Sequence, residues 1–426
     1  MSASAQLKKT ANKYLANYAE QEVTNLSSFP QAAIFQHVVV IPAFQETKAF
    51  IERFFSSALA KQQCLFIVVI NQPDSDYGRE HAQAQLDLAQ SIIEIANPIW
   101  QQGNLCLAEL NNTQVSDDLN MALASNSSVL IVDRYSHPIP AEQGVGLARK
   151  IGADLAATLF LKGNVKSPWI HSTDADATLP DNYLLAHHST DKLTHHCVVT
   201  CCNFYHHSAQ AEIHQANELY EMALRYYVAG LHYAKSPYAY FTIGSILSFD
   251  VFAYCQARGF PKRSAGEDFY LLNKLAKLGS IEFLPEVTIK LDARPSQRVP
   301  FGTGPAVKSI MALSEQNLDY QYYNPEVFVE LKASLSAFKC LWQYREKPEQ
   351  WLQKLTPIAH KAFIEIGLLS FIKKQKHANQ TQFDKQLTVW FDSFKTLKFI
   401  HALREYGLKN IALLQAIEIA PFKLEG

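Results

Sequence analysis

Three uninterrupted apolar runs constrain the fold of this chain more than any other feature of its sequence. HVVVIPAF (37–44), CLFIVVIN (64–71) and VLIVD (129–133) are rich in β-branched residues and show no alternation of apolar and polar positions. Such runs are typical of strands buried on both faces of a parallel sheet. Helical periodicity marks the segments that follow them, at 47–62, 79–96 and 142–163. Strands that alternate with helices predict an α/β fold with a mainly parallel mixed sheet.

The later part of the chain first extends this pattern and then departs from it. WIHSTDAD (169–176) and CVVTCCNFY (197–205) are predicted as further strands, and 208–234 as a long helix. Beyond residue 306 the apolar positions follow helical spacing, with one helix predicted around Phe363–Leu369 and another around Leu387–Ile400. The predicted organisation is an N-terminal helical arm at 1–33, an α/β domain at 34–305 and a C-terminal helical extension at 306–426.

Charge and cysteine content exclude several classes of protein. The 426-residue chain has a formal net charge of -1, which gives no reason to expect a nucleic-acid partner. Its 7 cysteines include no C-x-x-C pair, so neither a disulfide framework nor a zinc site is indicated. No window approaches the roughly twenty apolar residues that span a bilayer. We expect a cytoplasmic protein with at most peripheral contact at the inner membrane, and the oligomeric state is not readable from the sequence.

Two aspartates follow an apolar lead-in within WIHSTDADATLPDNY (169–183). In an extended segment, residues two apart point to the same side, so Asp174 and Asp176 can present their carboxylates together. Mg²⁺ and Mn²⁺ take oxygen ligands, usually one or two protein carboxylates together with water and substrate phosphates. The pattern therefore indicates a site for a divalent cation. Taken alone it fits an acidic surface loop better, and only the neighbouring motifs favour the cation.

Four stretches occur in an order that carries a family resemblance. They are VVVIPAFQET at the first strand, GVGLARKIGAD at the helix before the acidic strand, STDADATLPDNYL, and AGEDFYLLNKLAKLG at 265–279. Together, over residues 37 to 290, they resemble the family 2 glycosyltransferases, whose GT-A fold is a Rossmann-like nucleotide-binding domain. A later stretch, RPSQRVPFGTGPAV, is similar to that of a bacterial subgroup of the family.

The resemblance implies a reaction and its ligands. It implies metal-dependent transfer of a sugar from a UDP- or GDP-sugar to an acceptor hydroxyl, with Mn²⁺ or Mg²⁺ as the cation. Inversion at the sugar carbon is expected, although both stereochemical outcomes occur on this fold. A role in bacterial glycan or glycoconjugate synthesis follows, with a glycan, a lipid-linked or a small-molecule acceptor. The sequence names neither the sugar nor the acceptor.

Site residues follow from the same resemblance. It assigns the metal to Asp176, and contact with the ribose or the metal to Asp174. An inverting enzyme needs a carboxylate that accepts the acceptor's proton, and Asp268 matches that position. Glu267 is the alternative, since the sequence cannot separate the two. Without the other motifs, both would be read as carboxylates that stabilise the start of a helix.

The ends of the first two strands are expected to bind the nucleotide. The turn after the first strand would meet the base through Pro42, Phe44 and Glu46. Phe44 could stack on the base or fill the core. The family often has an aspartate after the second strand, whereas this chain has Asn71. An amide can hydrogen-bond a base, and Asp74 or Asp76 could also take the role.

Three arginines complete the candidate site. Arg149 matches a basic position that reaches the nucleotide in similar enzymes, while Lys150 must face elsewhere on the helix. The glycines at 144 and 146 can simply let this helix and a strand pack closely. In LDARPSQRVPFGTGPAV (291–307), Arg294 and Arg298 fit a flap that closes on the diphosphate, and an ordinary surface connection is the alternative.

Other protein classes remain in competition with a glycosyltransferase. A sugar nucleotidyltransferase would need a basic, glycine-rich phosphate loop after the first strand, and PAFQET is not such a loop. A non-catalytic sugar- or nucleotide-binding module would keep the fold without the chemistry. The presence of both acidic pairs argues against that module. A structural scaffold would act through the helical extension.

Overall fold

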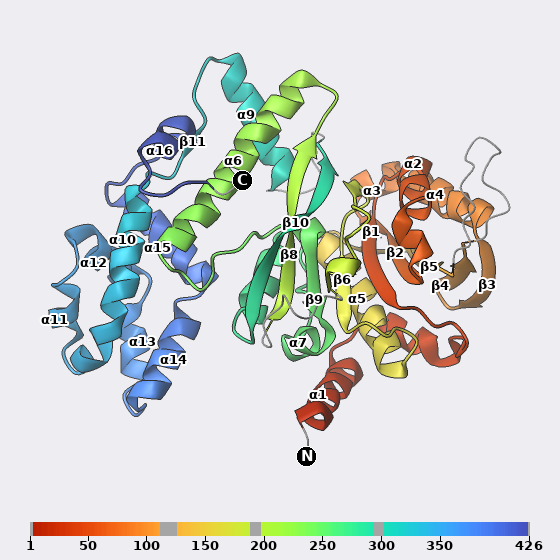
Figure 1. Cartoon of the computed structure of the whole chain (residues 1–426), viewed down its shortest axis with the longest axis horizontal. Coiled ribbons are helices and arrows are strands. Elements are labelled where there is room, and N and C mark those ends of the chain that lie inside the picture. Colours follow the sequence, from red (N-terminus) through yellow and green to blue (C-terminus); the bar gives the residue numbers. More distant parts are fainter. Residues whose placement is uncertain (1–2, 111–125, 188–196, 294–301, 425–426) are drawn as a thin grey trace. The chain divides into compact units, whose positions relative to one another are not determined.

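The computed structural model describes residues 3–110, 126–187, 197–293 and 302–424 (Figure 1). The described chain divides into two compact units. The first unit contains the residues up to His207 together with Thr242–Ala293, and the second contains Ser208–Phe241 together with the residues from Thr303 onward. The first unit is an α/β structure built on one ten-stranded sheet.

Strand order in the sheet is β3-β4-β5-β2-β1-β6-β9-β8-β10-β7. The strands are β1 (His37–Ala43), β2 (Cys64–Asp74), β3 (Asn97–Gln102), β4 (Leu105–Glu109), β5 (Ser128–Pro140), β6 (Trp169–Ser172), β7 (Ala177–Thr178), β8 (Cys197–His207), β9 (Leu247–Asp250) and β10 (Ser280–Asp292). Parallel pairing joins β5, β2, β1 and β6, and also β8 and β10. The other neighbouring pairs of described strands are antiparallel. The sheet is therefore mixed as predicted, but it is mainly parallel only at its centre.

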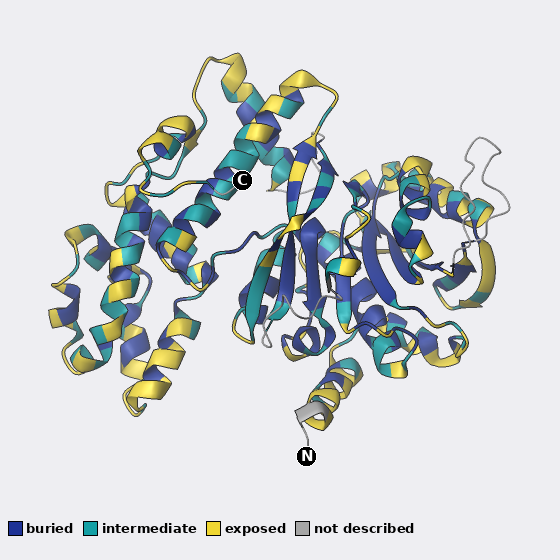
Figure 2. Ribbon diagram, in the orientation of Figure 1, coloured by how far each residue is buried: buried dark blue, intermediate teal, exposed yellow. Residues whose placement is uncertain are grey.

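Helices cover both faces of the central strands. The helices of this unit are α1 (Ala3–Asn17), η1 (Gln21–Ser28), α2 (Lys48–Phe55), η2 (Ala58–Lys61), α3 (Asp76–Glu80), α4 (Ala82–Ile95), α5 (Gly144–Lys162), η3 (Leu185–His187), η4 (Gly244–Ile246), α7 (Val251–Gln256) and α8 (Glu267–Leu275). Phe54 of α2 packs against Phe66 of β2, whereas Gly152 of α5 packs close to Val40 and Val69. Because Phe66 and Val69 are an odd number of residues apart on one strand, α2 and α5 lie on opposite faces. This arrangement explains the continuous apolar runs, and Figure 2 shows β1 and β2 as buried.

The direction in which the chain crosses the sheet reverses between β1 and β6. From β1 the chain passes through α2 to β2 and later to β5, and α5 then carries it back across to β6 on the other side of β1. Ligands of open α/β sheets bind at such a reversal, beyond the carboxyl ends of the strands. Pro42 is tolerated in a central strand because β6 pairs only with Val38–Val40 and has ended before it.

The second unit is mostly helical and has an aromatic core. Its elements are α6 (Ala211–Tyr233), α9 (Thr303–Glu315), β11 (Gln321–Tyr322), α10 (Glu326–Ala337), η5 (Phe338–Tyr344), α11 (Pro348–Leu352), α12 (Pro357–Glu365), α13 (Leu368–Lys374), α14 (Gln380–Trp390), α15 (Ser393–Glu405), β12 (Ile411–Ala412) and α16 (Leu413–Ile419). Phe328, Trp351, Phe363 and Phe399 are fully buried in it. The structure groups α6 with these helices, so the predicted division at residue 306 separates α6 from the helices it packs on.

Two predicted helices of this region are each divided in the structure. The apolar run around Phe363–Leu369 spans α12 and α13, because Gly367 adopts a φ of 92° between them. The run around Leu387–Ile400 spans α14 and α15, because Asp392 caps a new helix by accepting from the backbone N–H of Lys395. All 7 cysteines are free thiols, as predicted. None of the described helices has the length and apolar content needed to cross a membrane.

Candidate functional site

The acidic loop lies at the carboxyl end of β6, where the sequence predicted it. The strand ends at Ser172, and the backbone N–H of Ala177 donates to the carbonyl of Asp174 at 3.1 Å. Asp174 and Asp176 therefore occupy a turn, and the prediction of an extended segment is wrong at these two residues. Strand alternation cannot explain how their carboxylates are oriented. Both side chains are partly exposed, with Asp174 at 34%.

Arg149 on α5 is buried and binds this loop. Its side chain is only 3% exposed. Nη2 donates to Oδ1 of Asp174 at 2.6 Å, and Nη1 donates to Oγ of Ser172 at 3.0 Å and to the carbonyl of Thr173 at 3.4 Å. Nε donates to Oε1 of Glu267 at 2.9 Å. The planar guanidinium fork thus satisfies acceptors from two separate parts of the chain.

Glu267 and Asp268 begin α8 and lie in different environments. Gly266 precedes them with a φ of 72°, a left-handed conformation that favours glycine. Glu267 is buried at 6% exposure against Arg149, whereas Asp268 is partly exposed. Partial burial by the surrounding protein, and then the neighbouring charge of Glu267, raise the pKa of Asp268 to about 7. A carboxyl group with that pKa can accept a proton near neutral pH.

The charge of Arg149 is stabilised despite its burial. Burial lowers the pKa of the guanidinium, but the carboxylates of Asp174, Glu267 and Asp268 outweigh this effect and raise the pKa above its ordinary value. The guanidinium is therefore a fixed positive charge among three acidic groups.

Glycines on α5 explain how Arg149 reaches Glu267. The backbone N–H of Gly146 donates to the carbonyl of Arg263 at 3.0 Å. A Cβ atom on Gly146 would lie 2.5 Å from that carbonyl oxygen. The first turn of α5 can therefore lie directly against the loop that leads into α8. The sequence predicted close packing of a helix against a strand at this glycine; the close packing is present, but the partner is a loop.

A second arginine, which the sequence did not single out, holds the acidic loop from α2. Arg53 donates to the carbonyl of Ala175, between the two aspartates, and its Nη1 atom lies 3.1 Å from Oδ2 of Asp292. The backbone N–H of Asp292 donates to the carbonyl of Asp176 at 3.1 Å. No motif surrounds Arg53, and only the fold brings α2 to the end of β10.

The ends of β1 and β2 present aromatic and amide side chains. Phe44 is 9% exposed, and its ring centroid lies 6.0 Å from that of Tyr77, whose side chain is more open at 43%. The hydroxyl of Tyr77 donates to Oε1 of Gln45 at 3.0 Å. Asn71 is buried at 5% exposure at the end of β2. Tyr77 was not singled out from the sequence, although its position just after β2 was an available signal.

The structure describes only some of the remaining predicted residues. Pro42 is buried in β1, and Glu46 is partly exposed in the segment that follows Gln45. Arg294 and Arg298 lie outside the described residues, as does the middle of the stretch 291–307, whose described ends belong to β10 and α9. The structure thus brings together Arg149, Asp174 and Glu267, and it gives no geometry for the two flap arginines.

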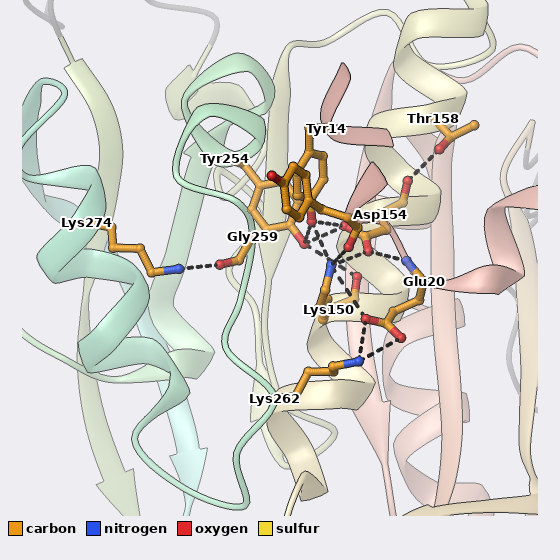
Figure 3. A network of polar contacts seen from close by, with 10 residues as sticks. Tyr14, Glu20, Lys150, Asp154, Thr158, Tyr254, Gly259, Lys262 and Lys274 are labelled. Atoms are coloured by element: carbon orange, nitrogen blue, oxygen red, sulfur yellow. Dashed lines mark hydrogen bonds and ion pairs between the residues drawn. The ribbon is translucent and has the colours of Figure 1, made fainter. Parts of the chain in front are cut away.

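Next to Arg149 on α5, Lys150 belongs to a different buried network (Figure 3). Its ammonium donates to Oδ2 of Asp154 at 2.7 Å and to the hydroxyl of Tyr14 at 2.8 Å. The Asp154 carboxylate also accepts from the hydroxyls of Tyr14 and Tyr254, at 2.6 and 2.8 Å. Burial raises the pKa of Asp154 even though Lys150 opposes that change. The network fastens helix α1 to the helix that carries Arg149.

Few protein groups at the acidic loop could hold a divalent cation. Within the described parts of the chain, no group of three or more His, Cys, Asp and Glu side chains could hold a metal ion. The candidate ligands are therefore the carboxylates of Asp174 and Asp176. One or two carboxylates are the usual protein share of a Mg²⁺ site that is completed by water and phosphate oxygens. This donor set fits such an ion bound together with a phosphate-bearing ligand.

Comparisons with known proteins find little sequence similarity. No protein-family model matches the chain, and no curated protein sequence matches it. Among solved structures, the chain is similar to a mannosyltransferase from Pyrobaculum calidifontis in complex with GDP-Man and Mn²⁺. The match has 11% sequence identity and a TM-score of 0.35, and it covers 95% of this chain and 99% of the other. Similarity at this level leaves the geometry of the site as the basis for a functional assignment.

Proposed function

We propose that this protein transfers a sugar from a nucleoside-diphosphate sugar to an acceptor hydroxyl in a metal-dependent, inverting reaction. The observation that carries the proposal is the position of Arg149 between Asp174 and Glu267. This contact joins the acidic loop after β6 to the acidic start of α8, next to the reversal point of the sheet. The family resemblance of the four sequence motifs supports the same reaction.

Asp268 is the proposed general base. Glu267 is already the partner of Arg149, and the pKa of about 7 suits Asp268 to accept a proton at neutral pH. As the acceptor oxygen bonds to the anomeric carbon, its proton passes to Asp268. The bond from that carbon to the phosphate oxygen breaks, and its electron pair leaves with the diphosphate. Attack opposite the leaving group inverts the carbon.

Asp174 and Asp176 are the proposed ligands of the cation, with Asp174 as an alternative contact to the ribose. A bound Mn²⁺ or Mg²⁺ would supply Lewis-acid stabilisation for the charge that develops on the leaving diphosphate. Arg53 supports this assignment, because it fixes the carbonyl between the two aspartates. This contact restrains the loop at Ala175.

The ends of β1 and β2 are the proposed nucleotide site. Phe44, Tyr77 and Asn71 offer a ring face and an amide to a base, and Pro42 and Glu46 flank them. Arg294 and Arg298 are proposed to contact the diphosphate. The choice between UDP and GDP stays open, as does the choice of acceptor. We also propose a cytoplasmic location and a role in glycan or glycoconjugate synthesis.

A thermal-unfolding panel tests the proposal. The full chain is heated with a series of UDP- and GDP-sugars, each with and without Mn²⁺. We expect at least one donor to raise Tm only when Mn²⁺ is present, since a ligand that binds the native state stabilises it. The variant Asp176→Ala is the control and should lose the metal-dependent part of the increase in Tm. The absence of a shift with every donor and metal combination would contradict the proposal.

The reaction products distinguish a glycosyltransferase from a binding module and from a nucleotidyltransferase. A glycosyltransferase releases free nucleoside diphosphate from the donor, slowly with water and faster with an acceptor. A binding module shows the Tm shift without release. A nucleotidyltransferase instead forms the nucleotide sugar from a nucleoside triphosphate and a sugar phosphate, and releases pyrophosphate.

A further inference from the structure

We propose that Arg149 is a positioning residue that holds Asp174 and Glu267 in one fixed arrangement and does not itself contact the donor. The inference rests on the proposed function. It also departs from the role that the family resemblance implies for this position, which is direct contact with the nucleotide.

The first argument is that the guanidinium is already hydrogen-bonded to protein groups. Each of its three nitrogens donates to a protein acceptor, at distances from 2.6 to 3.4 Å. The side chain is 3% exposed, so it presents almost no surface to a ligand. A donor phosphate could bind it only by displacing Glu267 or Asp174. Displacement of Glu267 would leave its buried carboxylate without its cation, which is strongly unfavourable.

The second argument comes from Gly244, which lies directly behind the guanidinium. A Cβ atom at this position would lie 2.6 Å from Nη2 and 2.9 Å from Cζ of Arg149. The carbonyl of Gly244 also accepts from Oγ of Ser172 at 3.4 Å, and Ser172 is one of the acceptors of Arg149. The glycine therefore leaves space for the guanidinium and nothing more. The backbone at Gly244 thus restricts where the Arg149 side chain can lie, as a positioning role requires.

The third argument is electrostatic. Arg149 lies among the carboxylates of Asp174, Glu267 and Asp268, which would otherwise repel one another. Because Arg149 is bonded to Glu267, Asp268 is left as the carboxyl group that exchanges a proton. The different roles of Glu267 and Asp268 thus depend on the guanidinium of Arg149, which takes no part in bond making.

The test uses one variant that displaces the guanidinium without removing any polar group and one that replaces it. Gly244→Ala introduces a single methyl group against Arg149, while Arg149→Lys keeps the charge but cannot bridge the two carboxylates. Both are measured for kcat, for the pH dependence of kcat/KM, and for binding of UDP and GDP without metal. We expect kcat to fall by at least about tenfold, the acidic limb of the pH profile to move, and metal-free nucleotide binding to change less than about twofold.

Gly230→Ala is the matched control. Its Cβ would lie 2.6 Å from the ring of Phe328 in the second unit, so it introduces an equally close contact away from Arg149. It should lower Tm and leave the acidic limb of the pH profile where it is. A similar movement of that limb in Gly230→Ala would show that general destabilisation is the cause, and would overturn the proposal.

A double-mutant cycle separates positioning from direct contact. If Arg149 acts through Glu267, Arg149→Lys should cost much less activity in the Glu267→Gln background than in the native one. Equal fold-losses in both backgrounds, or a tenfold loss of metal-free nucleotide binding in Arg149→Lys, would overturn the proposal.

A stability cycle with Arg149→Met and Glu267→Gln needs no turnover. Arg149→Met leaves Glu267 buried without its cation, and an unpaired buried charge destabilises the fold at the pH values where carboxylates are ionised. We expect a larger drop in Tm at high pH than at low pH, and its reversal by Glu267→Gln. If this coupling is present but no donor is cleaved, the proposed function fails. If donors are cleaved without the coupling, the positioning role fails.

Discussion

Nε of Arg149 lies 2.9 Å from Oε1 of Glu267, and 118 residues of sequence separate them. The same guanidinium binds Asp174, so two acidic motifs that are far apart in the chain become one site. Neither motif is informative by itself, since aspartates in a loop and carboxylates at a helix start are both common on protein surfaces. Their connection through the buried guanidinium of Arg149 distinguishes this arrangement from ordinary surface carboxylates.

Replacement of Asp268 by asparagine should abolish most of the activity while the protein stays folded. Asparagine keeps the size of the side chain and cannot accept the acceptor's proton. Loss of a general base typically lowers the rate by about 10²–10⁴-fold. Steady-state kinetics with the donor found in the thermal panel measures kcat. Full activity in this variant would assign the base elsewhere, and Glu267→Gln would then be tested for that role.

The pH dependence of the reaction should have an acidic limb near neutrality. The pKa of Asp268 is raised to about 7, so the base is protonated below that pH and available above it. We expect kcat/KM to increase with pH through about 7 and then level off. The limb should be missing from the residual activity of Asp268→Asn. An unchanged limb in that variant would attribute the titration to another group.

The same raised pKa predicts that Asp268 destabilises the native fold at alkaline pH. A carboxyl whose folded-state pKa is raised contributes its stability at low pH and loses it as pH increases through the folded value. Asp268→Asn should therefore be more stable than the native protein above about pH 7, by about 1–3 kcal/mol, with the advantage vanishing near pH 4. Denaturant titrations at both pH values measure the difference. A variant that is less stable at alkaline pH would contradict the burial of this charge.

Lys150→Met should strongly destabilise the first unit. The methionine retains the apolar stem but leaves the fully buried Asp154 without its cation, and breaking such a pair typically costs about 3–5 kcal/mol. Equilibrium unfolding in denaturant measures the loss. The double variant with Asp154→Asn should recover part of it, because the unpaired charge is gone. As a surface control, Arg404→Lys alters an exposed pair with Glu405 and should change stability little.

Tyr77→Ala should weaken nucleotide binding if its exposed ring lies beside the base. A ring contact of this kind contributes about 0.5–1.5 kcal/mol beyond buried area, which corresponds to a loss of about two- to tenfold in affinity. Calorimetric titration with UDP and GDP measures it, and Tyr77→Phe should keep most of the affinity. Tyr406→Ala in the second unit is the matched control, since its side chain is similarly exposed at 38%. Equal affinities in the native protein and Tyr77→Ala would remove Tyr77 from the nucleotide site.

The elements that could be predicted from the sequence are those whose burial leaves a local pattern. The runs of β1 and β2 are continuous because helices cover both faces, and α5 ends at Lys162 before the left-handed Gly163. The hairpin of β3 and β4 was missed because β3 is mostly exposed and contains Pro98. The break at Gly367 was missed because apolar spacing continues across it.

Several residues of the candidate site could be singled out from the sequence, but their arrangement could not. Asp174 and Glu267 could be singled out from their motifs, and Arg149 from its neighbours. Their mutual contact could not, because it depends on how closely Gly146 lets α5 approach the loop before α8. The contribution of Arg53 has no local signature, since a single arginine on a short helix resembles any solvated charge.

The connectivity of the two units restricts how this protein could have gained or lost parts. The chain enters the second unit at Ser208, returns to the first at Thr242, and enters the second again before its final helices. Helix α6 is therefore encoded between two strands of the sheet, while its packing partner Phe328 lies in the last third of the sequence. A stop codon after β10 would remove Phe328, and helix α6 would then lack this packing partner. The helical part is therefore not a simple appendage at one end of the chain, because one of its helices lies between two strands of the sheet in sequence.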